Sequence, residues 1–382
     1  MSRTRTLIVT LPPMRIGGVS SKVRILADEL LRRGHDVTVA YYDLPGRTDD
    51  PRLAFGEVAS VAVPCGRPWL EQRYTAGSPA WQNLVDTHDR HVALGGTVLI
   101  ANPLAEAKRR HMIWCAADLA GDRSHRQDAM PPWRRIADRM LVAPALRRQQ
   151  DAVLRADNRI FGVSFDTVRR LRSIARDRAD TIQRLPIPVD DAFFTLDAAS
   201  RRPNRIGFAG RLDDPRKNAP LLFAALGQLR RQGADVSLTA TGTGTAELDA
   251  LARRFEIADA VHFTGVLARE GLRDFYRSLD VFVIPSLQEG LAIAGVEAMA
   301  CGVPVVSTRC GGPEDFVRDG ETGRLCAFDA AEMAAAIRDV LSPDRRAAVS
   351  VAARRTVEET FAIRRFPSNL DDAWRATWNE SP

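Results

Sequence analysis

Two glutamates, Glu289 and Glu297, follow the apolar run Val281–Pro285, which predicts a buried strand. The segment Leu291–Ala300 predicts a helix that opens at the carboxyl end of this strand. A helix start has unpaired N–H groups and the positive end of the helix dipole, so it suits a phosphate. In a continuous helix the two glutamates would lie roughly 12 Å apart. This spacing favours two ends of one extended ligand over a single metal ion or a single proton.

Two cations, Arg211 and Lys217, follow a second predicted strand, Arg205–Ala209. A diphosphate leaving group gains negative charge as it departs, and fixed cations aimed at it lower the barrier. Lysines stand only at positions 22, 108 and 217 among the 54 basic residues, so a lysine in this loop is unusual for the chain. Arg216 is an alternative to Lys217 for the same role, and two solvated loop cations are the alternative without function.

The sequence around these residues resembles a known enzyme family. The Glu-x7-Glu pattern continues into Ala298-Met-Ala-Cys-Gly-Val-Pro-Val-Val-Ser307 and then Gly311-Gly-Pro-Glu314. These motifs resemble the retaining nucleotide-sugar glycosyltransferases of family 4, the glycosyl transferases group 1. The resemblance implies an α/β protein of GT-B fold, in which two Rossmann-like doubly wound domains face a central cleft. It also implies a hexosyltransferase-like enzyme of class EC 2.4.

The resemblance assigns roles to individual residues. Glu297 would bind the ribose hydroxyls, and one carboxylate can accept two such hydrogen bonds. Glu289 would lie at the transferred sugar, where nucleophile, charge stabiliser and sugar anchor all stay open as its role. The expected catalytic residues are Glu289, Arg211 and Lys217. The expected donor-binding residues are Gly18, Gly242, Leu267, Gly290, Leu291, Ala292, Ile293 and Glu297.

The loops of the first half fit the resemblance less closely. Gly17 and Gly18 form a glycine-rich turn between the predicted strand Thr6–Thr10 and the predicted helix Ser20–Arg33. Such a turn lets backbone approach a ligand, although it also serves simply as a turn. Many family members carry a histidine after the later strands, and here Asn102 and Asp118 stand near those positions. This departure leaves the acceptor-side chemistry open.

The length of 382 residues suits two domains rather than one core. Strand and helix patterns alternate, which predicts parallel βαβ units. We expect a first domain at 1–190, a linker near 190–203, a donor domain at 204–361, and a C-terminal segment 362–382 that returns to the first domain. Within the first domain Thr97–Ala101 predicts a buried strand. Pro131–Arg155 predicts a helix whose apolar side favours packing into the core over a membrane anchor.

The metal and redox signals are weak. No Asp-x-Asp occurs in the sequence, and the five cysteines have no paired close spacing. We therefore expect no metal and no cofactor beyond the nucleoside-diphosphate sugar, which is the donor substrate. The cysteine pattern favours a reducing compartment, and the N-terminus has too short an apolar run for a signal peptide. Because no stretch approaches the ~20 apolar residues of a membrane span, a cytoplasmic protein is expected.

The positive charge is concentrated in one region. Residues 123–184 contain 15 Arg against 7 Asp and no Glu, a net charge of 15 − 7 = +8, whereas the whole chain carries +6. Basic segments bind nucleic acid, anionic lipid or acidic substrates. With 7% aromatic residues and no recognition motif, nucleic acid is not an expected partner. Peripheral membrane contact at the inner face and solvated helix faces are the two interpretations of this region.

The predicted function is a retaining, metal-independent transfer of a sugar from a nucleoside diphosphate to an acceptor hydroxyl. A lipid-linked or cell-surface glycan in polysaccharide biosynthesis, a glycolipid or a secondary metabolite are the acceptors considered. Two alternatives remain, a sugar-nucleotide epimerase of GT-B fold and a non-catalytic nucleotide-sugar-binding partner. The Glu-x7-Glu segment disfavours the epimerase, and the missing acceptor-side histidine motivates the binding partner.

Overall fold

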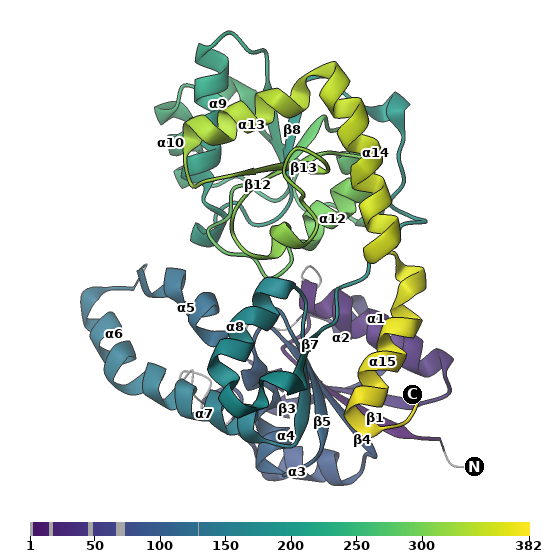
Figure 1. Ribbon diagram of the computed structural model, residues 1–382. Coiled ribbons are helices and arrows are strands. Elements are labelled where there is room, and N and C mark those ends of the chain that lie inside the picture. Colours follow the sequence, from purple (N-terminus) through teal and green to yellow (C-terminus); the bar gives the residue numbers. More distant parts are fainter. Residues whose placement is uncertain (1–2, 15–17, 45–48, 66–72, 129) are drawn as a thin grey trace. The chain divides into compact units, whose positions relative to one another are not determined.

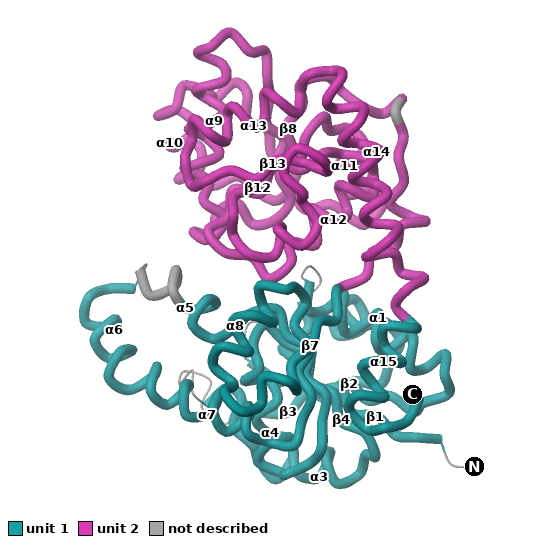
Figure 2. The backbone as a smooth tube through the Cα atoms, in the orientation of Figure 1, with its two compact units in different colours: residues 1–186, 367–382 teal, residues 187–366 magenta. Residues whose placement is uncertain are grey.

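The computed structural model describes residues 3–14, 18–44, 49–65, 73–128 and 130–382. The chain divides into two compact units (Figure 2). Unit 1 comprises residues 1–186 and 367–382, and unit 2 comprises residues 187–366. The first division therefore follows Pro186, and the linker expected near 190–203 belongs to unit 2.

Unit 1 is built on a sheet of seven parallel strands with the order β3-β2-β1-β4-β5-β6-β7 (Figure 1). Its strands are β1 (Arg5–Thr10), β2 (Asp36–Asp43), β3 (Ala59–Pro64), β4 (Arg90–Gly95), β5 (His111–Cys115), β6 (Asn158–Gly162) and β7 (Ile182–Arg184). Its helices are α1 (Gly18–Arg32), α2 (Pro51–Phe55), α3 (Pro79–Asp86), α4 (Asn102–Glu106), α5 (Leu119–Asp128), α6 (Pro132–Ala137), α7 (Ala143–Arg155), α8 (Phe165–Ala175) and α15 (Phe366–Trp378). The central strands are buried on both faces, as parallel sheets covered by helices require.

Unit 2 is built on a sheet of six strands with the order β10-β9-β8-β11-β12-β13, and all of its pairs are parallel. Its strands are β8 (Arg205–Phe208), β9 (Ser237–Ala240), β10 (Val261–Phe263), β11 (Val281–Ile284), β12 (Val305–Thr308) and β13 (Gly323–Cys326). Its helices are α9 (Ala219–Arg231), α10 (Ala246–Arg254), α11 (Arg269–Arg277), α12 (Ile293–Ala300), α13 (Ala330–Leu341) and α14 (Pro343–Thr360). The two doubly wound sheets confirm the predicted α/β class with two Rossmann-like domains.

One strand predicted in unit 1 is wrong. Thr97–Ala101 is not a strand, because Val98–Ala101 forms a 3-10 turn that continues into α4, and the strand of this region is β4. The side chains of the turn are as buried as those of a strand, so an apolar run does not distinguish the two. Ile100 also lies against Gly95, where an added Cβ would meet it at 2.9 Å. The chain therefore turns at the glycines instead of extending through them.

The last helix of the chain, α15, packs against unit 1. In α15 the Trp374 ring meets His35 at a centroid distance of 5.4 Å, and Asp371 forms an ion pair with Arg33. The Arg159 Nε donates to the carbonyl of Ala376 at 3.0 Å. These contacts place residues 367–382 in unit 1, although they follow all of unit 2 in the sequence.

Candidate functional site

The candidate site lies where the strand order of unit 2 reverses. β8 pairs with β9 on one side and with β11 on the other, so the chain leaves β8 in one direction and later returns beside it. Ligands of open α/β sheets bind beyond the carboxyl ends of the strands at such a point. The loop after β8 carries Arg211 and Lys217, and the loop after β11 carries Glu289.

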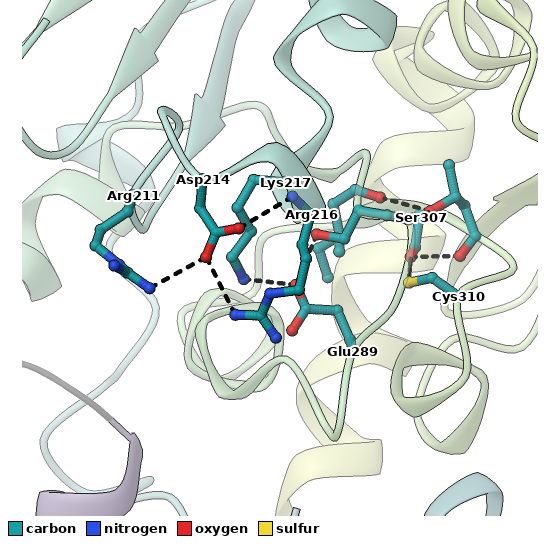
Figure 3. A network of polar contacts seen from close by, with 10 residues as sticks. Arg211, Asp214, Arg216, Lys217, Glu289, Ser307 and Cys310 are labelled. Carbon is teal, nitrogen blue, oxygen red and sulfur yellow. Dashed lines mark hydrogen bonds and ion pairs between the residues drawn. The ribbon is translucent and has the colours of Figure 1, made fainter. Parts of the chain in front are cut away.

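The loop after β8 holds Lys217 on a short 3-10 turn. Asp214 caps this turn by accepting from the backbone N–H of Arg216 at 3.0 Å, and Asn218 ends it in the left-handed region. Lys217 Nζ then donates to Glu289 Oε1 at 2.6 Å (Figure 3). The two candidate catalytic groups are therefore joined across the switch point, although they are far apart in the sequence.

The other two cations of this loop lie at Asp214. Asp214 Oδ2 is 3.1 Å from the Arg211 guanidinium and 3.2 Å from that of Arg216 (Figure 3). The two arginines hold the pKa of the Asp214 carboxyl below its usual value against the effect of burial. Arg211 is 72% exposed in its side chain, so a ligand can reach it. The turn thus places two guanidinium groups at Asp214, next to the Lys217 ammonium that pairs with Glu289.

Glu289 is held from several sides. Its side chain accepts from Ser286 Oγ at 2.6 Å as well as from Lys217. Its backbone N–H donates to Cys310 O, and its carbonyl accepts from Gly312 N, so Glu289 and Gly311 form an isolated parallel bridge. Only 9% of the residue is exposed. The loops after β11 and β12 therefore fix this carboxylate before any ligand arrives.

The start of α12 differs from the sequence prediction. The helix begins at Ile293 instead of Leu291, because Ala292 takes the left-handed conformation with φ 62° and ψ 62°. The segment between Glu289 and Glu297 is therefore only partly helical, and the expected spacing along a continuous helix is wrong. A left-handed alanine costs about 1–2 kcal/mol, and such strain concentrates at functional sites.

Gly312 explains why the loop before α12 bends. A Cβ built on Gly312 would meet Gly290 O at 2.5 Å and Leu291 Cα at 2.6 Å, and both neighbours are backbone atoms. Only glycine lets the two loops approach so closely. The backbone of residues 290–293 therefore owes its position to a residue on another loop.

We expect Gly312→Ala to destabilise unit 2. The clash should lower the free energy of unfolding by about 1–3 kcal/mol, and the Tm should fall roughly 2–4 °C for each kcal/mol. Calorimetry measures the shift. Gly271→Ala is the control, because its Cβ would meet only Leu267 at 3.6 Å and alanine favours the helix α11. An unchanged Tm in Gly312→Ala would contradict the close approach.

Glu297 faces the aromatic side of α11. Its Oε2 accepts a hydrogen bond from the Tyr276 hydroxyl at 2.8 Å, and Tyr276 is buried. Desolvation raises the pKa of the Glu297 carboxyl from 4.5 to about 7, although the bond from Tyr276 acts in the opposite direction. At neutral pH both the neutral and the ionised form of this carboxyl are therefore populated.

This pKa predicts a pH-dependent stability for Glu297→Gln. The folded state binds the proton more tightly than the unfolded chain, so stability is lost as the pH rises from about 4.5 to about 7. Glutamine cannot ionise. At pH 8 the variant should be more stable than the wild type by up to about 3 kcal/mol, and the difference should vanish near pH 4. Urea unfolding across this range measures it, with the exposed Glu270→Gln as control. A difference independent of pH would be the contrary result.

The loops after β9 and β10 meet at two glycines, Gly242 and Gly265. Gly242 and Gly265 exchange backbone hydrogen bonds of 2.8 and 3.0 Å, and both have positive φ. Thr241 Oγ1 accepts from Gly210 N at 3.0 Å, which ties this pair to the loop of Arg211. The donor-binding candidates Gly242 and Leu267 therefore lie on loops after β9 and β10, at the same edge of the sheet as Lys217 and Glu289.

Comparisons with known proteins bear on this edge of unit 2. The family model described as glycosyl transferases group 1 matches residues 203–343. We call residues 203–343 the group 1 domain, after the model that matches them. The match encloses the loops of Arg211, Lys217, Gly242, Glu289 and Glu297 in one domain.

Relatives that match longer stretches of the chain than the family model does are also named glycosyltransferases. The chain is 28% identical to the D-inositol 3-phosphate glycosyltransferase of Acidothermus cellulolyticus over 87% of its own length and 79% of the relative. It is 36% identical to a GDP-mannose-dependent α-(1-6)-phosphatidylinositol monomannoside mannosyltransferase of Mycolicibacterium smegmatis over 45% of its own length and 50% of the relative. These matches confirm the predicted enzyme class, a glycosyltransferase. For these two relatives and a D-inositol 3-phosphate glycosyltransferase 2 of Catenulispora acidiphila, the matched stretch spans 36–79% of the relative's own length.

A solved structure supports the fold at the level of the whole chain. The chain is similar to Anabaena HepE in complex with UDP and glucose, with a TM-score of 0.75 and 17% identity. The likeness covers 98% of this chain and 100% of that one. It confirms the GT-B architecture, while the narrower assignment to family 4 stays a prediction.

The group 1 domain does not hold every residue that the sequence singled out. Gly18 opens α1 in unit 1, and Gly17 lies outside the described residues. In unit 1 the Asn102 side chain donates to Thr75 O and to Glu106, so it serves local structure. Asp118 accepts from Gly121 N at the start of α5. Neither residue is joined to the group 1 domain by these bonds.

Sequence reasoning missed three residues that position the group 1 site. Ser286 holds Glu289, Tyr276 holds Glu297, and Asp214 caps the turn of Lys217. Ser286 and Asp214 stand beside the motif residues, so local turn chemistry could have suggested them. Tyr276 lies on another helix, and no signal in the sequence connects it with Glu297.

Across the described residues, no cluster of three or more His, Cys, Asp or Glu side chains could hold a metal ion. In the same part of the chain, no helix is long and apolar enough to cross a membrane.

Proposed function

We propose that this protein transfers a sugar, with retention of anomeric configuration and without a metal ion, from a nucleoside diphosphate to an acceptor hydroxyl. The observation that carries the proposal is the 2.6 Å pair between Lys217 and Glu289 at the switch point of the sheet. It sets an ammonium beside the carboxylate of the loop that leads into α12. A sugar diphosphate needs a cation for its phosphates and a carboxylate near its sugar.

The arrangement supplies charge where the reaction develops it. The diphosphate gains negative charge as it leaves, and Arg211, Lys217 and the start of α12 would stabilise that charge in place of a metal. The sugar gains oxocarbenium character, and the Glu289 carboxylate stabilises positive charge near it. In the free protein Lys217 neutralises Glu289. We infer that the diphosphate takes over part of this contact when the donor binds.

The same edge of the sheet offers a place for the nucleoside. Glu297 would accept from the ribose hydroxyls in its ionised form, and the loops of Gly242 and Leu267 would lie along the donor. Attack of the acceptor on the face that the diphosphate leaves gives retention, and the departing phosphate accepts the proton of the acceptor hydroxyl. In this scheme the bond from the anomeric carbon to the diphosphate breaks, and a bond to the acceptor oxygen forms.

The acceptor is proposed as a class rather than as a compound. Relatives are named for inositol phosphate and for phosphatidylinositol mannoside, so phosphorylated inositols and glycolipids are the acceptors to test first. The motifs that the family uses on the acceptor side are those that resemble it least in this chain. A surface glycan in polysaccharide biosynthesis and a secondary metabolite remain in the same panel.

The test incubates the full chain with UDP- and GDP-sugars in the presence of a chelator and follows products by mass spectrometry. We expect slow release of one nucleoside diphosphate, accelerated by a true acceptor, and a product with the donor's anomeric configuration. Binding of a nucleoside diphosphate without release would favour a non-catalytic binding partner. A changed sugar that still carries its nucleotide would favour an epimerase. A requirement for divalent metal would overturn metal independence.

A further inference from the structure

The helical run from α6 to α7 presents apolar side chains to solvent. The sequence predicts that this side packs into the core, and that prediction is wrong. Trp133 is 72% exposed, Ile136 62%, Met140 71% and Leu141 69%. Large apolar residues rarely gather in solvent unless they meet a partner. We call Trp133, Ile136, Met140 and Leu141 the apolar edge.

The run has an anchored end and a projecting end. In α7 the residues Leu146, Val153 and Leu154 are buried, and Leu146 packs with Leu99 and Leu119. In α6 no residue is buried. A π-helical turn, Asp138–Val142, joins the two helices. Figure 1 shows α6 at the outer end of this run, away from the sheet of unit 1.

One buried ion pair fixes which face of the run points outward. Asp138 forms an ion pair with Arg123 of α5, and both side chains are almost fully buried. Ile136 and Met140 each stand two residues from Asp138, about 200° around a helix, so they lie on the opposite face. The pair therefore turns Ile136 and Met140 to solvent and keeps the one acid of this segment away from them.

Within residues 131–148 the exposed charges are of one sign. Arg134, Arg135 and Arg139 are exposed and alternate with the residues of the apolar edge. Residues 131–148 contain five arginines and one acid, Asp138, which faces inward. An amphipathic helix with tryptophan and long aliphatic groups beside arginines suits the interface of an anionic bilayer. A two-fold contact between copies of this edge would bring Arg134, Arg135 and Arg139 of both copies together, six like charges, which disfavours it.

We propose that the apolar edge and its arginines are a docking surface for an anionic lipid bilayer. Trp133, Ile136, Met140 and Leu141 enter the boundary between headgroups and acyl chains, and Arg134 and Arg139 contact lipid phosphates. The inference is independent of the proposed transfer reaction, because it concerns only unit 1.

Vesicle binding tests the proposal with the full chain. We expect sedimentation with vesicles that contain one third phosphatidylglycerol in phosphatidylcholine, and little with phosphatidylcholine alone. Arg134→Gln with Arg139→Gln should weaken binding about 25-fold, since each arginine near such a surface contributes about fivefold. Trp133→Ser with Met140→Ser should weaken it at least tenfold, roughly, through lost burial. Arg253→Gln with Arg254→Gln, and Leu53→Ser with Val351→Ser, are the controls for exposed charge and exposed apolar groups.

Tryptophan fluorescence reports on the same contact. Trp81, Trp114 and Trp374 are at most 2% exposed, whereas Trp133 is 72% exposed. Anionic vesicles should therefore shift the emission to shorter wavelength, and Trp133→Phe should abolish most of the shift while vesicle binding persists. The proposal is overturned if the apolar variant binds as the wild type does. If oligonucleotides and vesicles both bind through the arginines alone, the proposal is also overturned, in favour of a general polyanion site. If the protein forms a concentration-dependent dimer that the apolar variant loses, the occupant of the apolar edge is a second copy of the chain.

Discussion

Lys217→Ala should reduce kcat for nucleoside diphosphate release by about 10²–10³, while UDP or GDP binding weakens less than tenfold. The ammonium acts mainly on charge that develops as the leaving group departs, so its loss affects the transition state more than the ground state. In the free protein the same group lies 2.6 Å from Glu289 Oε1. Single-turnover kinetics with the active donor separate the two effects, and calorimetric titration gives the binding constants.

Two controls sharpen this result. Arg230→Gln removes a cation of unit 2 that pairs with Asp259 on the surface, so its kcat should equal that of the wild type. Arg216→Gln removes a cation of the same 3-10 turn as Lys217, which lies at Asp214. A larger loss for Arg216→Gln than for Lys217→Ala would transfer the catalytic role to Arg216. An unchanged kcat in Lys217→Ala would remove the site assignment altogether.

Glu297→Ala should raise the dissociation constant of the nucleoside diphosphate about 100-fold. A carboxylate that accepts two ribose hydroxyls contributes about 1.5 kcal/mol or more for each charged hydrogen bond. Because the pKa of Glu297 is raised to about 7, binding to the wild type should also weaken as the pH falls from 8 to 6. The variant should lose this pH dependence. Calorimetric titrations with UDP and GDP at three pH values measure both effects.

The outcome separates a ligand contact from a structural role. Glu297 also accepts from Tyr276, so loss of that bond alone could loosen α11 and α12. Tyr276→Phe removes the same bond and keeps the ring. If Tyr276→Phe weakens binding as much as Glu297→Ala does, Glu297 acts by holding the helices rather than by meeting the ribose.

Much of the fold follows from local sequence. The strands predicted at Arg205–Ala209 and Val281–Pro285 agree with β8 and β11 to within one residue at each end, because short apolar runs bounded by glycine or proline specify buried strands. The candidate residues of the site were also visible, because Glu289, Lys217 and Gly242 each stand in a turn directly after a strand. Parallel strands place such turns at one edge of the sheet, so their common location follows from alternation alone.

The sequence by itself thus determined the doubly wound architecture and the loops that carry the chemistry. Tertiary structure decided the start of α12, because the backbone of Gly312 meets Gly290 and Leu291 from another loop. It also decided that Val98–Ala101 turns, that Tyr276 meets Glu297, and that the apolar edge at Trp133 stays in solvent. An apolar pattern indicates that burial of a helix face is favourable, but only the neighbouring elements determine whether that face packs into the core.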